Sequence, residues 1–249
     1  MKPAPFEYVA AHSIREAIHA LRHEHAQVLA GGQSLVPALN RRDATPQRVV
    51  DINPIATLGV LRRTNGSLHI GATVRQATLE RSELIAANWP LLAQAVRFVG
   101  HPATRARGTV CGSVAHANPR AELPLALQAL DARYITSRRM LTAFALDDGE
   151  FLTSVVVPPP PENATTAFHE FARTAGDWAD AAVAVVLAPQ HAAVAVLGAG
   201  RASAAEAALR EGASAEDAAR LAARLITDPH RRAVTAELAR TALNEAGRA

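Results

Sequence analysis

Four consecutive prolines, Pro158–Pro161, divide the chain into two parts with different residue patterns. A proline has a fixed φ angle and no amide hydrogen, so a run of prolines forms a stiff, extended connection. Before this run, short apolar stretches alternate with helical patterns, whereas after it three strand patterns are followed by helical ones. We therefore predict a first domain over residues 1–161, with α/β subdomains at about 1–55 and 56–161, and a small C-terminal α/β domain over residues 162–249.

Local signals place the elements of the first domain. Ser13 followed by Glu16 has the spacing of a capping box and predicts a helix over residues 14–23. Asn65-Gly66 predicts a tight turn between strands at 59–63 and 67–71. The stretch from Gly100 to Pro124 is rich in glycine and hydroxyl side chains and has no clear period, which favours irregular structure. The other expected elements are strands at 27–30, 48–52 and 151–157, one helix burying residues from Leu84 to Val96, and a buried helix at 123–130.

The C-terminal part is expected to combine a three-stranded antiparallel sheet with helices, which makes the whole chain α+β. Its strands are predicted at 166–173, 181–188 and 192–197, and its helices at 202–211, at 215–226 and from Asp228-Pro229 onward. Gly198-Ala199-Gly200 has the start of a dinucleotide-binding fingerprint. More helix follows it instead of a second strand, so we interpret it as a strand-to-helix turn.

Composition excludes several chemistries. Cys111 is the only cysteine among 249 residues, so the chain cannot form an internal disulfide, a cysteine zinc site or a cysteine-ligated iron–sulfur cluster. Lys2 is the only lysine, which argues against a phosphate-loop lysine or a Schiff base. The net charge of +3 comes from dispersed arginines, so no nucleic-acid surface is expected. His19 and His23 lie one helical turn apart without a third ligand, so no metal site is expected either.

The sequence also bears on location. No apolar run reaches the roughly 18 residues that a membrane helix needs, and the first residues lack the apolar centre of a signal peptide. We therefore expect a cytoplasmic protein without a membrane span.

The first candidate binding motif is Ala30-Gly31-Gly32-Gln33-Ser34-Leu35, which follows a predicted strand. Adjacent glycines allow positive φ angles and a close approach of the backbone to a ligand. Successive amide groups in such a bend can bind an anion, and the Ser34 hydroxyl adds a donor, which suits a pyrophosphate without lysine. The alternative is an ordinary Gly-Gly turn. We refer to residues 30–35 as the first glycine segment.

A second glycine segment, residues 107–113, offers a similar backbone surface and is followed by Glu122 just before a helix. Two such segments are what a long dinucleotide with a central diphosphate needs, and Glu122 could accept hydrogen bonds from its sugar hydroxyls. His116 lies in the same glycine-rich region and is a further candidate. The alternative for this segment alone is a tight loop that caps the following helix.

Several motifs occur together in an order known from one family. They are Ala30–Leu35, Asp51-Ile52-Asn53, Ile70-Gly71-Ala72, Thr109–Ser113, Ala115–Pro124 and Gly176-Asp177-Trp178. On these motifs the chain resembles the FAD-binding medium subunit of molybdenum hydroxylases of the carbon monoxide dehydrogenase and xanthine dehydrogenase type. The resemblance covers nearly the whole chain and implies a two-part, PCMH-type FAD-binding domain followed by a small C-terminal domain.

The resemblance also implies the cofactor site. The residues expected to bind FAD are Ala30, Gly31, Gly32, Gln33, Ser34 and Leu35 on one side of the diphosphate, Thr109, Val110, Cys111, Gly112 and Ser113 on the other, His116 and Glu122 at the sugars, and Leu152 near the adenine or the ring system. No side chain is expected to act as acid, base, nucleophile or metal ligand, because the flavin supplies the redox chemistry.

The function implied by the resemblance is electron transfer within a heteromeric oxidoreductase. FAD on this chain would take electrons from 2Fe-2S clusters on a small subunit, which receive them from a molybdenum–pterin large subunit, in an assembly expected to be a dimer of heterotrimers. The segment from Arg138 to Glu150 is shorter than is usual in the family. This shortening leaves open a flavin-free assembly subunit with the same fold, and a freestanding flavin oxidase is a third, less favoured reading.

Overall fold

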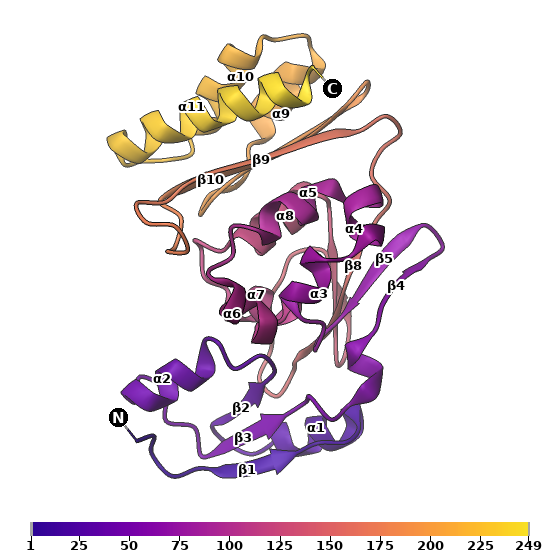
Figure 1. The fold of residues 1–249 in the computed structure, drawn as a ribbon, viewed down its shortest axis with the longest axis vertical. Coiled ribbons are helices and arrows are strands. Elements are labelled where there is room, and N and C mark those ends of the chain that lie inside the picture. The colour runs from indigo at the N-terminus through magenta and orange to yellow at the C-terminus, as the bar shows by residue number, and fades with distance from the viewer. Residues whose placement is uncertain (1, 249) are drawn as a thin grey trace. The chain divides into compact units, whose positions relative to one another are not determined.

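The computed structural model describes residues 2–248 and confirms the α+β fold expected from the sequence (Figure 1). Its contacts divide the chain into two compact units. Unit 1 consists of the residues up to Thr78 together with Pro102–His116 and Arg133–Val157, and unit 2 consists of Leu79–His101, Ala117–Ala132 and the chain from Pro158 onward. Within residues 2–248, no helix combines the length and the apolar character that crossing a bilayer requires.

Unit 1 begins with a parallel β-sheet whose strand order is β1-β3-β2. Ser13 caps the first helix as predicted, because its side-chain oxygen accepts a hydrogen bond from the amide of Glu16. Since the strands are parallel, their carboxyl ends meet at one edge of the sheet, where ligands bind in sheets of this kind. The elements are β1 (Glu7–Ala10), α1 (Ile14–Leu21), β2 (Ala26–Leu29), α2 (Leu35–Arg41) and β3 (Arg48–Asp51).

Unit 1 also contains a five-stranded antiparallel sheet with the order β4-β5-β8-β6-β7. The predicted hairpin is confirmed: Asn65 and Gly66 both have positive φ angles, of 50° and 81°, as a two-residue turn between twisted strands requires. The elements are a 3-10 helix η1 (Ala56–Gly59), β4 (Leu61–Thr64), β5 (Ser67–Gly71), β6 (Arg133–Thr136), β7 (Met140–Leu141) and β8 (Leu152–Val157).

The glycine-rich stretch was expected to be irregular, and this prediction is wrong. It contains two short helices, α6 (Pro102–Arg107) and α7 (Val110–His116), and a third, α3 (Gln76–Glu80), precedes it in the chain. In α7 the buried side chains are those of Val110, Cys111 and Val114. Their spacing of one and three residues places them on one helical face, but the intervening Gly and Ser residues hide this period in the sequence.

Unit 2 is built on an antiparallel sheet with the order β12-β11-β10-β9. The predicted three-stranded meander is confirmed, and a two-residue strand is added at its edge. The strands are β9 (Thr165–Phe171), β10 (Ala181–Ala188), β11 (His191–Val196) and β12 (Gly200–Arg201). Gly198 and Gly200 have φ angles of 73° and 82°. The turn here joins β11 to β12, and helix α9 follows only after β12, so the expected strand-to-helix turn is corrected to a turn between two strands.

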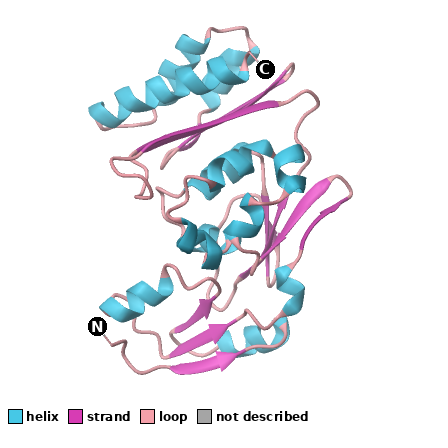
Figure 2. Cartoon of the chain, in the orientation of Figure 1, coloured by secondary structure: helices cyan, strands magenta, loops and turns pink. Residues whose placement is uncertain are grey.

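Helices cover both faces of this sheet (Figure 2). One face carries α9 (Ser203–Arg210), α10 (Ala215–Ala223) and α11 (Pro229–Ala246), and the other contacts α5 (Pro90–Val96) and α8 (Glu122–Ala129). Small side chains let the layers approach closely: Val183, Val185 and Val194 pack with Ala218 and Ala222 in one buried cluster. The core of unit 2 is therefore made largely of valine and alanine.

The single helix predicted from Leu84 to Val96 is in fact two helices, α4 (Glu83–Asn88) and α5. The break lies at Trp89, whose φ and ψ angles are −134° and 60°. A proline disfavours the helical conformation of the residue before it, and Pro90 is the first residue of α5. The break lets the buried indole of Trp89 donate a hydrogen bond of 2.8 Å to the carbonyl of Pro158.

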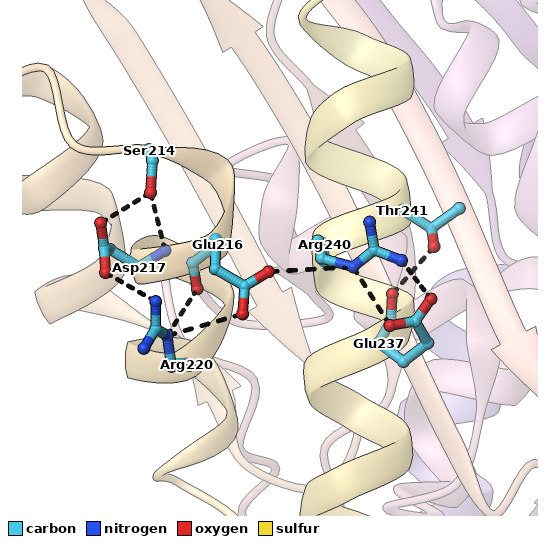
Figure 3. Close-up of polar contacts among 7 residues, drawn as sticks. All are labelled: Ser214, Glu216, Asp217, Arg220, Glu237, Arg240 and Thr241. Atoms are coloured by element: carbon cyan, nitrogen blue, oxygen red, sulfur yellow. Dashed lines mark hydrogen bonds and ion pairs between the residues drawn. The ribbon is translucent and has the colours of Figure 1, made fainter.

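The start of α10 carries a cap whose loss is expected to destabilise unit 2 (Figure 3). The Ser214 Oγ accepts a hydrogen bond of 3.1 Å from the amide of Asp217. We predict that Ser214→Ala lowers the free energy of unfolding by about 1 kcal/mol, the usual cost of losing a serine cap. Urea unfolding followed by circular dichroism measures this. Arg240→Gln, which removes only exposed ion pairs, with Glu216 at 3.9 Å and with Glu237, should cost less. An equal loss would contradict the assignment.

Candidate cofactor-binding site

The first glycine segment connects β2 to α2 at the carboxyl edge of the parallel sheet. Gly32 has a φ angle of +73°, a left-handed conformation that favours glycine. In the described part of the chain, the amide groups of Gly31–Ser34 donate to no carbonyl or side chain. Several neighbouring donors without acceptors form a surface that suits an anion.

The second glycine segment is not a loop throughout, as the sequence suggested, but the cap and first turn of α7. Thr109 is 2% exposed, and its Oγ1 accepts a hydrogen bond of 3.0 Å from the amide of Gly112. Its carbonyl accepts another, of 3.1 Å, from the amide of Ser113. The amide of Val110 pairs with the carbonyl of Val74 at 3.2 Å, which joins this turn to the segment after β5.

The structure brings the two glycine segments into direct contact at Gly31. A Cβ atom built on Gly31 would lie 2.6 Å from the carbonyl oxygen of Arg107, 2.8 Å from the Cα of Gly108 and 3.0 Å from the nitrogen of Thr109. Real Cβ atoms do not approach backbone atoms this closely. Glycine is therefore required at position 31 for steric reasons, and the two segments form one continuous backbone surface.

Two polar side chains that were not expected at the cofactor site connect these segments. Arg75 donates hydrogen bonds of 2.6 Å to the carbonyl of Arg107 and 2.7 Å to the side-chain oxygen of Asn53. Asn53 in turn donates one of 2.8 Å to the carbonyl of Ala30 and one of 2.6 Å to Asp51. A signal for Asn53 was available, because it closely follows β3, the strand beside β2, at the same sheet edge.

Gln76 hydrogen-bonds to the second glycine segment and packs against it. Its side chain is 5% exposed, and its backbone amide donates to the carbonyl of Gly108 at 2.9 Å. A Cβ on Gly108 would lie 2.5 Å from the Gln76 Oε1. That oxygen is buried and has no hydrogen-bond partner among the described residues. A side chain at position 108 would have to displace the buried amide group of Gln76, whereas at Gly31 it would meet backbone atoms.

The other three residues expected at the site lie outside the two glycine segments. His116 is the last residue of α7 and is exposed, and Leu152 begins β8 with 4% of its surface exposed. Both belong to unit 1. Glu122 is the first residue of α8 in unit 2 and is 2% exposed. Their roles toward a cofactor stay predictions.

Glu122 is one of two carboxyl groups in unit 2 that burial holds toward the protonated form. Burial raises the pKa of Glu122. Burial, and in second place the charge of Glu122, raises the pKa of Glu170 to about 8. Glu170 lies on β9 opposite Ala182, and its Oε2 is buried with no hydrogen-bond partner among the described residues. Ionisation of Glu170 is therefore disfavoured both by burial and by the charge of Glu122.

Cys111 is placed where it cannot act as a nucleophile. Its side chain is 2% exposed, and burial raises the pKa of its thiol to about 12. Because only the thiolate reacts readily, we predict that the native protein does not react with a thiol reagent at pH 8. A colorimetric disulfide reagent tests this, with the urea-unfolded chain, which should titrate one thiol, as the control. Rapid reaction of the native protein would contradict the buried placement.

The site as a whole is built for binding. Within residues 2–248, no group of three or more His, Cys, Asp or Glu side chains is arranged to hold a metal ion. The carboxyl edge of the parallel sheet carries a set of backbone amides, and the guanidinium of Arg75 hydrogen-bonds to the backbone beside them. Fold and site together are those of a protein that binds a dinucleotide cofactor.

Comparison with known proteins identifies the family. Residues 4–160 match the family described as the FAD binding domain in molybdopterin dehydrogenase, and the chain belongs to this family. The chain is 40% identical to the 6-hydroxypseudooxynicotine dehydrogenase complex subunit alpha of Paenarthrobacter nicotinovorans, over 72% of this chain and 66% of that protein. It is 33% identical to the carbon monoxide dehydrogenase medium chain of Hydrogenophaga pseudoflava, over 75% of this chain and 70% of that protein.

Solved structures agree with the family. A chain of the carbon monoxide dehydrogenase of Hydrogenophaga pseudoflava that lacks the Mo-pyranopterin moiety of its molybdenum cofactor superposes with a TM-score of 0.92. The match has 31% identity and covers 100% of this chain and 99% of that chain. In sequence, by contrast, the matches cover only about two thirds of the two relatives' lengths, 66% and 70%.

The chain is thus a flavoprotein component of an oxidoreductase, and FAD is its cofactor. The residues present fit this group. Four adjacent amides, Gly31–Ser34, have no acceptor among the described residues and can hold a diphosphate, and the second segment lies directly against them. The guanidinium of Arg75 adds positive charge next to the lysine-free segments.

Proposed function

We propose that this chain is the FAD-carrying electron-transfer subunit of a heteromeric molybdenum hydroxylase. The observation that carries the proposal is the contact at Gly31, which unites two segments about 75 residues apart into one anion-binding surface. Bound FAD supplies the redox chemistry, because a flavin accepts and releases electrons.

The chain's own residues bind and orient the cofactor. The amides of Gly31–Ser34 hold one side of the diphosphate, and Thr109–Ser113 hold the other. His116 and Glu122 reach the sugar hydroxyls, and Leu152 packs near the adenine or the ring system. The assignments at the two glycine segments rest on the family resemblance together with the backbone geometry, and those of His116, Glu122 and Leu152 rest on the resemblance alone.

The partners follow from the chain's own composition and from the relatives. With Cys111 as its only cysteine, the chain cannot ligate an iron–sulfur cluster, so the clusters belong to a small subunit. The relatives are named as a complex subunit and as a medium chain, which supports a large molybdenum–pterin subunit as the third component. We propose a dimer of heterotrimers in the cytoplasm, in which electrons pass from the clusters to FAD and then to an external acceptor.

Native mass spectrometry and absorbance of the purified complex test this function. We expect three kinds of subunit and one FAD per copy of this chain, with absorbance near 450 nm. A complex without flavin would overturn the proposal.

The sequence left open a flavin-free assembly subunit with the same fold, and the match to the FAD-binding family argues against it. The short stretch from Arg138 to Glu150, which motivated this alternative, closes back on itself through the buried carboxylate of Glu150. Stoichiometric binding of FAD by the isolated chain would exclude this alternative. We also propose that residues 1–161 form the cofactor domain and residues 162–249 the C-terminal domain, which limited proteolysis at Pro158–Pro161 would test.

A further inference from the structure

Arg75 touches both halves of the candidate site although it belongs to neither glycine segment. It lies between β5 and α3, and one of its nitrogens donates to the carbonyl of Arg107 at 2.6 Å. Another nitrogen donates to Asn53 at 2.7 Å, and Asn53 donates to the carbonyl of Ala30 at 2.8 Å. A single guanidinium therefore links the carbonyl just before Gly31 to the carbonyl just before Gly108.

These two carbonyls matter for an anion because of peptide geometry. In a trans peptide the C=O and the following N–H point in opposite directions. When Asn53 holds the carbonyl of Ala30, the amide of Gly31 is turned to the other side, where it has no acceptor in the described chain. The carbonyl of Arg107 lies against Gly31, and its partial negative charge would repel a phosphate if Arg75 did not bind it.

The charges around Arg75 favour an anion nearby. The guanidinium is partly buried, and burial, followed by repulsion from Arg107, lowers its pKa. Asp51 opposes this effect, but its carboxylate already accepts hydrogen bonds from Tyr8 at 2.6 Å and from Asn53. A bound diphosphate would relieve the repulsion between the two arginines.

We propose that Arg75, acting with Asn53, is a positioning residue that joins the two glycine segments and sets the affinity for the diphosphate of FAD; the inference rests on the proposed function. Arg75 acts through the two carbonyls, because its guanidinium donates to the carbonyl of Arg107 and to Asn53, which binds the carbonyl of Ala30. Arg75 is the basic group whose hydrogen bonds link the two lysine-free segments, directly to the second and through Asn53 to the first.

The test compares variants of the full-length chain, stripped of flavin and titrated with FAD by fluorescence quenching. Arg75→Met is expected to raise the Kd for FAD at least about tenfold, the effect of losing hydrogen bonds to a charged group. Arg48→Met is the matched control. Arg48 lies at the amino end of β3 and donates to Glu7 at 2.6 Å and to the carbonyl of Ala20 at 3.2 Å. It should lower the thermal midpoint of the flavin-free protein but change the Kd less than about twofold.

Two further measurements separate positioning from general stability. Inorganic pyrophosphate should compete with FAD for the site. Arg75→Met should raise the Kd for pyrophosphate by a factor similar to that for FAD. Arg75→Lys, which keeps the charge but not the two-armed guanidinium, should bind FAD with intermediate affinity. Unchanged pyrophosphate affinity in Arg75→Met, or wild-type FAD affinity in Arg75→Lys, would overturn the inference.

The outcomes also distinguish this inference from the proposed function. If the wild-type chain binds FAD and Arg75→Met binds it equally well, only the inference fails. If neither the wild-type chain nor its complex binds FAD, the proposed function fails and the inference fails with it.

Discussion

Replacing Gly31 with alanine should abolish tight FAD binding, with a rise in Kd of at least about a hundredfold, or about 3 kcal/mol. The added Cβ would lie 2.6 Å from the carbonyl oxygen of Arg107 and 2.8 Å from the Cα of Gly108. These are backbone atoms held by Arg75 and Gln76, so they cannot move aside as a flexible side chain would. The two glycine segments must then separate, and the amides of Gly31–Ser34 lose their alignment with the start of α7.

Flavin content of the purified variant and FAD titration measure this effect. Gly59→Ala in the same unit is the control, since its Cβ would meet only the Thr73 Oγ1, at an ordinary 3.5 Å. Circular dichroism shows whether Gly31→Ala remains folded. A folded Gly31→Ala chain with full flavin content would show that the contact between the segments is not needed for the cofactor.

The need for glycine at position 31 illustrates what sequence alone could not supply. The pair Gly31-Gly32 marked a turn after a strand, which is local information. Which glycine is sterically required depends on Arg107 and Gly108, more than seventy residues away. Position 32 favours glycine for another reason, which is its positive φ angle of 73°.

The same division between local and distant information holds for the fold. The hairpin at Asn65-Gly66 and the cap at Ser13 were predictable because a few neighbouring residues determine them. Strand β1 (Glu7–Ala10) was missed because its four residues are mostly exposed and pair only with β3, forty residues away. Helix α2 was not predicted, although its Pro37 lies in the first turn, where a proline is tolerated.

Arg75 was missed for a different physical reason. A charged residue after a strand is normally solvated, and nothing in the neighbouring sequence indicates that its partners are Arg107 and Asn53. Asn53 itself was part of a family motif, but its role became visible only when β2 and β3 were placed side by side. Side chains that bridge distant backbone segments are specified by the packing of the whole fold.

Replacing Glu170 with glutamine should stabilise the protein at alkaline pH, and the gain should depend on pH. Burial and the nearby Glu122 raise the pKa of Glu170 to about 8 from the usual 4.5. Between these two values the folded chain keeps a proton that the unfolded chain has released. The folded state then binds more protons, so the contribution of Glu170 to stability is fully present below about pH 4.5 and is lost as the pH rises to about 8.

Glutamine has the shape of protonated glutamate but cannot ionise, so it avoids this loss. The difference in unfolding free energy between Glu170→Gln and wild type should be near zero at pH 5 and about 1–2 kcal/mol at pH 8.5, a figure reduced for the partial solvent exposure of the side chain. The variant also removes a charge next to Glu122, which should let that carboxyl ionise more readily and add to the gain.

Urea unfolding at a series of pH values measures the effect, and the exposed Glu162→Gln serves as the control because its curve should follow the wild type. A pH-independent difference would mean that Glu170 acts through packing alone. A larger gain at pH 5 than at pH 8.5 would reverse the sign and exclude a protonated Glu170 in the native protein. The expected slope therefore tests whether the folded chain keeps Glu170 protonated up to about pH 8, as burial and the nearby Glu122 require.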